Sequence, residues 1–181
     1  MTLPFKWLAA AAVAVVVCLR GPAAQAESSA DAVVKAGFVY NFAKFTEWPA
    51  GALSGSQISL CLVGGDPLGA VSSLLEGKPL QGRTLAVRRN VRGDEIKGCS
   101  IVYLTDVDER RQNDALRALR GLPVLTIGDA EGFADAGGMI GLVSADDRIQ
   151  FEVNIDTSQR AGLKINSQLL KLARSVKGKA P

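Results

Sequence analysis

The residue types that usually carry catalysis are sparse in this sequence. The chain has no histidine, which removes the commonest general base, the usual activator of serine and cysteine nucleophiles, and the most frequent metal ligand. Its few cysteines cannot supply the four ligands that structural zinc takes. Carboxylates are plentiful, but the sequence does not show which of them pair. We therefore expect a protein that is not an enzyme and needs neither metal nor cofactor. A hydrolase of unfamiliar type is the weaker alternative.

Two places resemble ligand sites of α/β proteins. The stretch from Gly64 to Gly69 lies between a predicted strand and a predicted helix, where phosphate-binding loops occur. It lacks the Lys-Ser/Thr pair and the GxGxxG spacing, and Asp66 would repel phosphate, so it is interpreted as a plain turn. Asp129 and Glu131 follow another predicted strand, on the side where α/β sheets bind ligands. Helix capping explains these two carboxylates equally well.

A polar row in the C-terminal third is the best candidate for a functional surface. Ile149, Phe151 and Val153 alternate with polar residues between 148 and 154, which predicts a strand with one core face and one polar face. A solvated edge strand is the simpler interpretation. The candidate partner- or ligand-binding residues are Arg148, Glu152 and Asn154, with Arg160 beyond them. Alternatively, Glu152 and Arg160 pair with each other and hold the last helix against the sheet.

The N-terminus has the pattern of a cleaved signal peptide. Lys6 precedes an apolar run over residues 7–19, and Ala24 and Ala26 provide the small residues that signal peptidase requires. The run is shorter than the roughly 20 residues that span a bilayer, although a retained anchor is the alternative. We expect residues 1–26 to be removed and residues 27–181 to form a single domain, located in the periplasm and not inserted in the membrane.

The cysteines and the charge balance fit an exported protein. Cys18 would leave with the signal peptide, and we expect Cys61 and Cys99 to form a disulfide, because cysteines of exported chains usually pair. Two buried free thiols are the alternative. Removal of Lys6 and Arg20 leaves 19 basic residues against 18 acidic ones. That balance argues against nucleic acid as the partner, which needs a concentrated basic face.

The order of the predicted elements indicates the fold class. A helix is expected over residues 30–47, and strands then alternate with helices as far as residue 127. Such alternation is typical of a parallel sheet covered by helices. Two further strands, over 139–143 and 148–153, flank a turn and predict an antiparallel hairpin. A last helix is expected over 166–176. We predict a three-layer α/β sandwich with a mixed, largely parallel sheet and an antiparallel edge hairpin.

Several segments, in order along the chain, resemble the YfiR family of periplasmic regulators. They include the stretch from Phe38 to Pro49, the turn from Asp66 to Gly69, Cys99 before an apolar strand, the strand from Phe151 to Asn154, and residues 160–173. The resemblance covers nearly all of the expected mature chain. The resemblance is specific because many separate segments match in the same order, so it does not depend on any single motif.

The resemblance implies a periplasmic α/β protein that forms a homodimer. It also implies a repressor that binds the periplasmic domain of an inner-membrane diguanylate cyclase, which lowers cyclic di-GMP and biofilm formation. A module that binds a small molecule and signals to a membrane partner is the alternative. Some relatives have a second cysteine pair in the C-terminal third. This sequence has no cysteine after Cys99, so redox control through that pair is not implied.

Overall fold

The computed structural model describes residues 23–145 and 148–178. Its centre is an eight-stranded sheet in the order β10-β8-β7-β6-β5-β2-β4-β3. The strands are β2 (Gln57–Gly64), β3 (Pro79–Leu80), β4 (Arg83–Arg88), β5 (Ile101–Thr105), β6 (Leu125–Gly128), β7 (Ile140–Ala145), β8 (Arg148–Asn154) and β10 (Ser175–Lys177). A separate antiparallel pair joins β1 (Thr46–Glu47) to β9 (Lys164–Ile165).

The sheet is mixed and largely parallel, as the sequence predicted. Strands β4, β2, β5, β6 and β7 pair in parallel, and β7 and β8 form the antiparallel hairpin. The hairpin is not at the outermost edge, because β10 pairs in parallel with β8. All five residues of β5 are buried, which is expected for a central strand covered on both faces.

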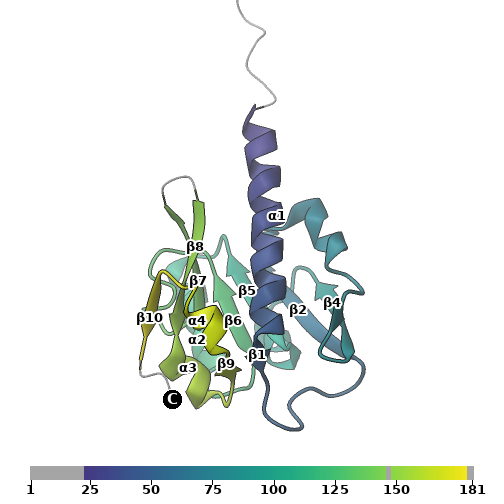
Figure 1. Ribbon diagram of the computed structural model, residues 1–181, viewed down its shortest axis with the longest axis vertical. Helices are drawn as coiled ribbons and strands as arrows, with labels where there is room; N and C mark the ends of the chain where they lie inside the picture. Colours follow the sequence, from purple (N-terminus) through teal and green to yellow (C-terminus); the bar gives the residue numbers. More distant parts are fainter. Residues whose placement is uncertain (1–22, 146–147, 179–181) are drawn as a thin grey trace, which may run out of the picture.

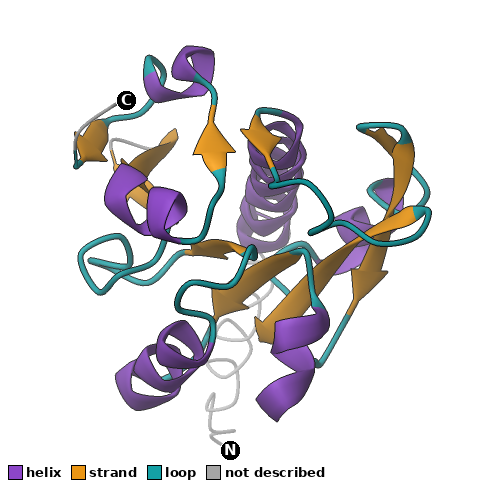
Figure 2. Ribbon diagram, turned by 90° about the horizontal axis from the view of Figure 1, so that it is seen from below, coloured by secondary structure: helices purple, strands orange, loops and turns teal. Residues whose placement is uncertain are grey.

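The first face of the sheet is covered by α1 (Ala23–Lys44), the long helix in Figure 1 and the one seen nearly end-on in Figure 2. Its side chains Phe38 and Phe42 pack edge-on against Phe151 of β8, with ring centroids 5.6 and 4.9 Å apart. Phe42 and Phe151 are almost completely buried. Aromatic contacts of this geometry add to the energy of burial, so these rings fix the helix across the hairpin side of the sheet.

The opposite face is covered by two shorter helical segments, η2 (Gly93–Gly98) and α2 (Glu109–Ala118), as Figure 2 shows. Leu116 and Leu119 of the α2 region join a second buried apolar cluster with Val102 and Leu104 of β5. Asp108 caps α2, because its side chain accepts a hydrogen bond from the backbone N–H of Arg111. Helices therefore lie on both faces of the sheet, and the predicted three-layer α/β class is confirmed.

Three helices differ from the predicted ones. Helix α1 begins at Ala23 and ends at Lys44, so it starts earlier and stops earlier than the expected span of 30–47. Two of its apolar side chains, Val33 and Val34, are 55 and 44% exposed. The segment after Pro67 forms the 3-10 helix η1 (Gly69–Leu74) instead of an α-helix.

The C-terminal helix expected over 166–176 was wrong. The chain forms α3 (Ile155–Arg160), a four-residue helix α4 (Ser167–Leu170) and then strand β10. Leu172 is 74% exposed. Residues 175–177 instead pair in parallel with β8, which gives their backbone groups hydrogen-bond partners along the edge of the sheet.

Candidate functional site

The candidate polar row lies on one face of β8, as its alternation predicted. Phe151 and Val153 point into the buried cluster beneath α1, so Arg148, Gln150, Glu152 and Asn154 point to the other face of the sheet. Arg148 is exposed and the other three are partly buried. Because β8 is flanked by β7 and β10, this row lies inside the sheet and not along a free edge.

The row lies on the same face of the sheet as α2. Glu152 is opposite Gly141 of β7, and a Cβ added at Gly141 would lie 3.6 Å from the Cβ of Phe133. Phe133 belongs to the buried cluster beneath α2. The loop that contains Phe133 therefore covers the base of this face, and the residues toward Arg148 extend beyond that cover.

Asn154 has a structural role. Its side-chain amide donates to the carbonyl of Ala134 at 2.8 Å, and its side-chain oxygen accepts the backbone N–H of Thr157 at 3.0 Å. The first bond fastens the covering loop, and the second caps α3. Both polar groups of the Asn154 side chain are therefore occupied. A partner could bind them only if these two hydrogen bonds were broken.

Arg148 and Glu152 differ from Asn154. Within residues 23–145 and 148–178, neither side chain has a hydrogen bond or an ion pair. The guanidinium of Arg160 donates to the hydroxyl oxygen of Thr157 at 2.9 Å, within α3. The suggested pair between Glu152 and Arg160 is not found among the described residues. The structure thus brings three of the four candidates onto one strand face, and Arg160 stands at the far end of the next helix.

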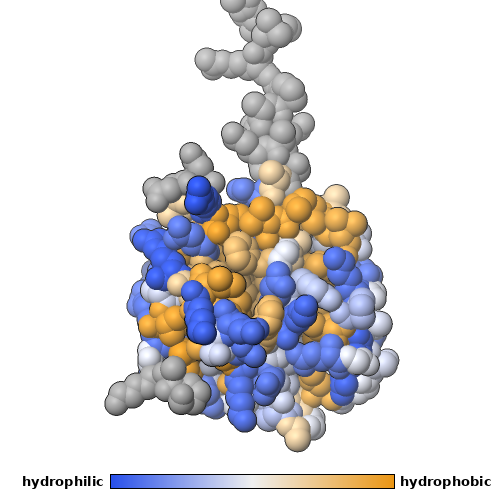
Figure 3. Space-filling view, in the orientation of Figure 1, coloured by the Kyte–Doolittle hydropathy of each residue, from blue (hydrophilic) through white to orange (hydrophobic). Residues whose placement is uncertain are grey.

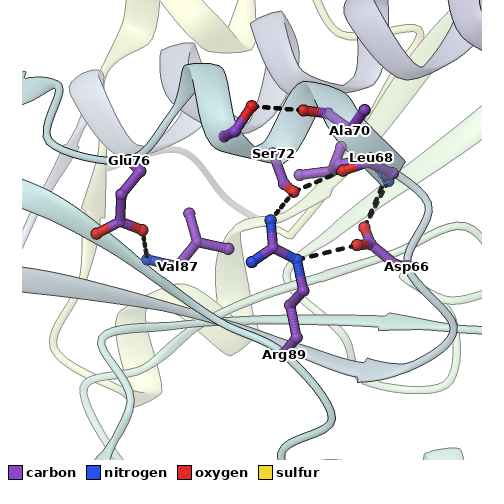
Figure 4. A network of polar contacts seen from close by, with 9 residues as sticks. Asp66, Leu68, Ala70, Ser72, Glu76, Val87 and Arg89 are labelled. Carbon is purple, nitrogen blue, oxygen red and sulfur yellow. Dashed lines mark hydrogen bonds and ion pairs between the residues drawn. The ribbon is translucent and has the colours of Figure 1, made fainter.

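The glycine-rich turn after β2 is occupied by its own acid. One carboxylate oxygen of Asp66 accepts the backbone N–H groups of Leu68 and Gly69 at 3.1 and 2.8 Å, as Figure 4 shows for Leu68. The guanidinium of Arg89 donates to the other oxygen at 3.2 Å and also bonds the Ser72 hydroxyl. The amides that a phosphate would need are already bound. This agrees with the interpretation of residues 64–69 as a plain turn between a strand and a helix.

The same turn is held closely against β5. Gly64 has φ +92, and a Cβ added there would lie 1.9 Å from the carbonyl oxygen of Thr105. Both the backbone conformation and the contact distance require glycine at this position. A glycine in this turn therefore serves packing between two parallel strands.

Asp129 is neither a helix cap nor an open ligand site. One of its oxygens accepts Lys35 Nζ at 2.9 Å, Thr105 Oγ1 at 3.1 Å and the Tyr103 hydroxyl at 3.3 Å. Burial, reinforced by the charge of Asp129, raises the pKa of Tyr103 well above its usual value. Lys35 lies on α1, so this cluster ties the long helix to the carboxyl ends of β5 and β6. Glu131 is exposed.

The predicted disulfide is present. Cys61 of β2 and Cys99, which follows η2, are joined with an S–S distance of 2.00 Å and a Cα–Cα distance of 6.1 Å. Both cysteines are buried in the cluster beneath α2. The described residues contain no group of acids or cysteines placed to hold a metal ion. In that same part of the chain, no helix has the length and apolar character required to cross a bilayer. The proposed signal peptide lies mostly outside the described residues.

Sequence reasoning missed one feature, a small cavity between η2 and α2 with Arg92 and Arg111 among its lining residues. From the sequence alone, the short basic stretch of Arg88, Arg89 and Arg92 is typical of a solvated strand end. In the structure Arg89 is engaged by Asp66, and Arg92 instead faces α2. The signal in the sequence was weak, because the two arginines are far apart along the chain and neither lies in a motif.

Comparisons with known proteins identify a family and a related fold. The model of a family described as YfiR/HmsC-like matches residues 32–174. A crystal structure of a conserved domain protein from Vibrio cholerae aligns with a TM-score of 0.50 at 10% identity, covering 81% of this chain and 60% of that one. The chain thus spans less than two thirds of that protein, and the likeness concerns the fold alone. The ABC domain from Streptococcus pneumonia, solved with L-Trp, aligns with a TM-score of 0.45 at 11% identity, covering 67% of this chain and 55% of that one. That score is too low to support an inference.

Proposed function

Because this chain belongs to the YfiR/HmsC-like family, we propose that it represses an inner-membrane diguanylate cyclase by binding the cyclase's periplasmic domain. The family consists of periplasmic regulators of cyclic di-GMP signalling. In detail, we propose that this protein acts by direct binding, lowers cyclic di-GMP and biofilm formation, and performs no catalysis. We also propose that it works as a homodimer after removal of residues 1–26.

One observation from the structure supports the polar row as part of the binding surface. Arg148 and Glu152 carry charges that no other described residue engages, although they lie in a well-packed sheet. Their strand is already fixed by Phe151 and Val153 on its core face. Charged side chains without a folding role, held on a rigid strand, are suited to recognising a complementary charge on another protein. Asn154 holds the loop next to this row, because its side-chain amide donates a hydrogen bond to the carbonyl of Ala134.

Charge reversal tests this proposal. We expect Arg148→Glu and Glu152→Arg to raise cellular cyclic di-GMP while leaving the melting temperature nearly unchanged, because Arg148 is exposed, Glu152 is only partly buried, and neither side chain has a hydrogen bond or ion pair among the described residues. Substitutions of this kind usually shift stability by less than about 0.5 kcal/mol. Arg88→Glu is the matched control, since Arg88 is an exposed arginine on β4, at the other end of the sheet from β8. It should leave repression intact.

The measurement combines cyclic di-GMP assays with co-purification of the cyclase's periplasmic domain. Full repression by both row variants would contradict the assignment of the row. Derepression accompanied by loss of folded protein would instead show that the charges serve stability. Failure of the wild-type protein to co-purify with any membrane diguanylate cyclase would contradict the proposed function itself.

Export is a separate part of the proposal. Cleavage after Ala26 would leave Glu27 as the first residue and would keep most of α1. Mass spectrometry of protein isolated from the periplasm should therefore give a chain that begins at Glu27. A full-length chain recovered with the membrane fraction would show that the apolar run is retained as an anchor.

A further inference from the structure

A cavity lies between η2 and α2, on the sheet face opposite α1. Its volume is about 340 Å³, at the lower end of the range for small-molecule sites, roughly 300–1,000 Å³. Its apolar lining consists of Val63, Val91, Ile96, Val107, Ala115 and Ala118. These side chains are aliphatic, without an aromatic ring among them. Such a lining suits an alkyl chain better than a flat ring, which gains from aromatic contacts.

The charges around the cavity are unevenly compensated. Four charged residues contribute to it: Arg92, Asp94, Arg111 and Asp114. Asp94 is paired with Lys97 at 2.6 Å, and Asp114 is paired with Arg117. The side chains of Arg92 and Arg111 have no hydrogen bond or ion pair within the described residues. Both acids are therefore paired with neighbours in their own helices, and Arg92 and Arg111 remain as the unpaired charges among the lining residues.

Two free guanidinium groups beside an aliphatic pocket select one kind of ligand. Guanidinium groups bind carboxylates through paired, charge-assisted hydrogen bonds, and the lining offers burial to a short hydrocarbon chain. We propose that this cavity binds a small alkyl carboxylate, with the carboxylate at Arg92 and Arg111 and the chain against Val91, Ile96 and Ala118.

The disulfide forms part of this site's support. Cys99 directly follows η2, and its bond to Cys61 fastens that end of η2 to strand β2. Val63, Val91 and Ile96 of the cavity belong to the same buried cluster as both cysteines. The position of the η2 wall therefore depends on the cross-link. The proposal does not rest on the regulatory function, because cavity and polar row share no residue.

Calorimetric titration with octanoate tests the proposal on the full mature protein. We expect saturable binding to one site. Arg92→Gln and Arg111→Gln should each weaken it at least tenfold, because each removes one of the two charges that face the carboxylate. Arg110→Gln is the matched control, since Arg110 is the exposed neighbour of Arg111 on the same helix but does not line the cavity. It should bind octanoate like the wild type. Octanol, which has the chain without the charge, should bind at least tenfold more weakly.

A second variant tests whether the alkyl chain of the ligand lies in the cavity. Ala118→Phe puts a large side chain into the cavity from an exposed position and should abolish octanoate binding without lowering the melting temperature. The proposal is overturned if the wild type does not bind octanoate, or if Ala118→Phe binds it unchanged. It is equally overturned if Arg110→Gln weakens binding as much as Arg111→Gln does, since the effect would then be one of general charge.

Discussion

At the scale of single residues, neighbouring positions on one strand have different roles. Glu152 and Asn154 lie two residues apart on the same face of β8, and the sequence pattern treats them alike. In the structure Asn154 makes two hydrogen bonds that hold the covering loop and α3, whereas Glu152 has no such contact among the described residues. Mutational data on this row therefore have to separate loss of fold from loss of recognition.

Asn154→Ala should destabilise the protein by about 1–3 kcal/mol, because it removes a helix cap and leaves the carbonyl of Ala134 without its donor. Denaturant titration measures this loss. Asn154→Asp is the informative companion, since a carboxylate can still cap α3 but cannot donate to Ala134. It should recover part of the stability. An unchanged unfolding midpoint for Asn154→Ala would show that these two bonds are not important for the fold.

At the scale of elements, the disulfide joins the strand β2 to the end of η2. It closes a loop with a sequence separation of 38 residues, which corresponds to about 4 kcal/mol in the chain-entropy model. In that model the cross-link stabilises the fold mainly by restricting the unfolded chain. Both cysteines are buried, so the disulfide itself does not face a partner.

Replacement of both cysteines by alanine should lower the free energy of unfolding by about 4 kcal/mol while leaving partner binding intact. The measurement is denaturant unfolding of the double variant beside oxidised and reduced wild type, with co-purification of the cyclase domain as the second readout. Reduced wild type should resemble the double variant. Free thiols in protein purified under oxidising conditions would contradict the disulfide.

At the scale of the whole molecule, several large apolar side chains are exposed around α1. Val33, Val34 and Leu74 of η1 are among the exposed large hydrophobic residues, and Figure 3 shows apolar side chains gathered around the upper turns of α1 and the neighbouring η1. Exposed apolar patches often mark protein interfaces. We propose this patch as the interface of the homodimer, with the same patch on a second copy as its occupant.

Val34→Glu should convert the proposed dimer to a monomer, because two copies of the charge would be buried against each other in a symmetric interface. Light scattering coupled to size exclusion measures the mass. Lys44→Glu, a charge change on the same helix at an exposed position away from the patch, should leave the mass unchanged. A monomeric wild type at high micromolar concentration would contradict the dimer.

The sequence by itself determined the fold class, the longer strands of the sheet and the disulfide. Central strands such as β5 are continuous apolar runs, and the alternation along β8 assigned each side chain to its face, because strand periodicity is a local property of the chain. The same reasoning identified Arg148, Glu152 and Asn154 as one row. It also predicted the cysteine pair, because cysteines of exported chains usually form disulfides.

Only the tertiary structure decided what each polar residue does. Asn154 has a structural role because the loop at Ala134 folds over its strand and accepts a hydrogen bond from it. Asp129 connects to α1 because it accepts a hydrogen bond from Lys35 of that helix. The apolar spacing of residues 165–176 is consistent with a helix, but residues 175–177 instead form a strand that pairs with the edge of β8. Arg92 and Arg111 meet at one cavity only after η2 and α2 pack on the same face. Contacts between distant segments depend on packing of the whole chain, and no local pattern encodes them.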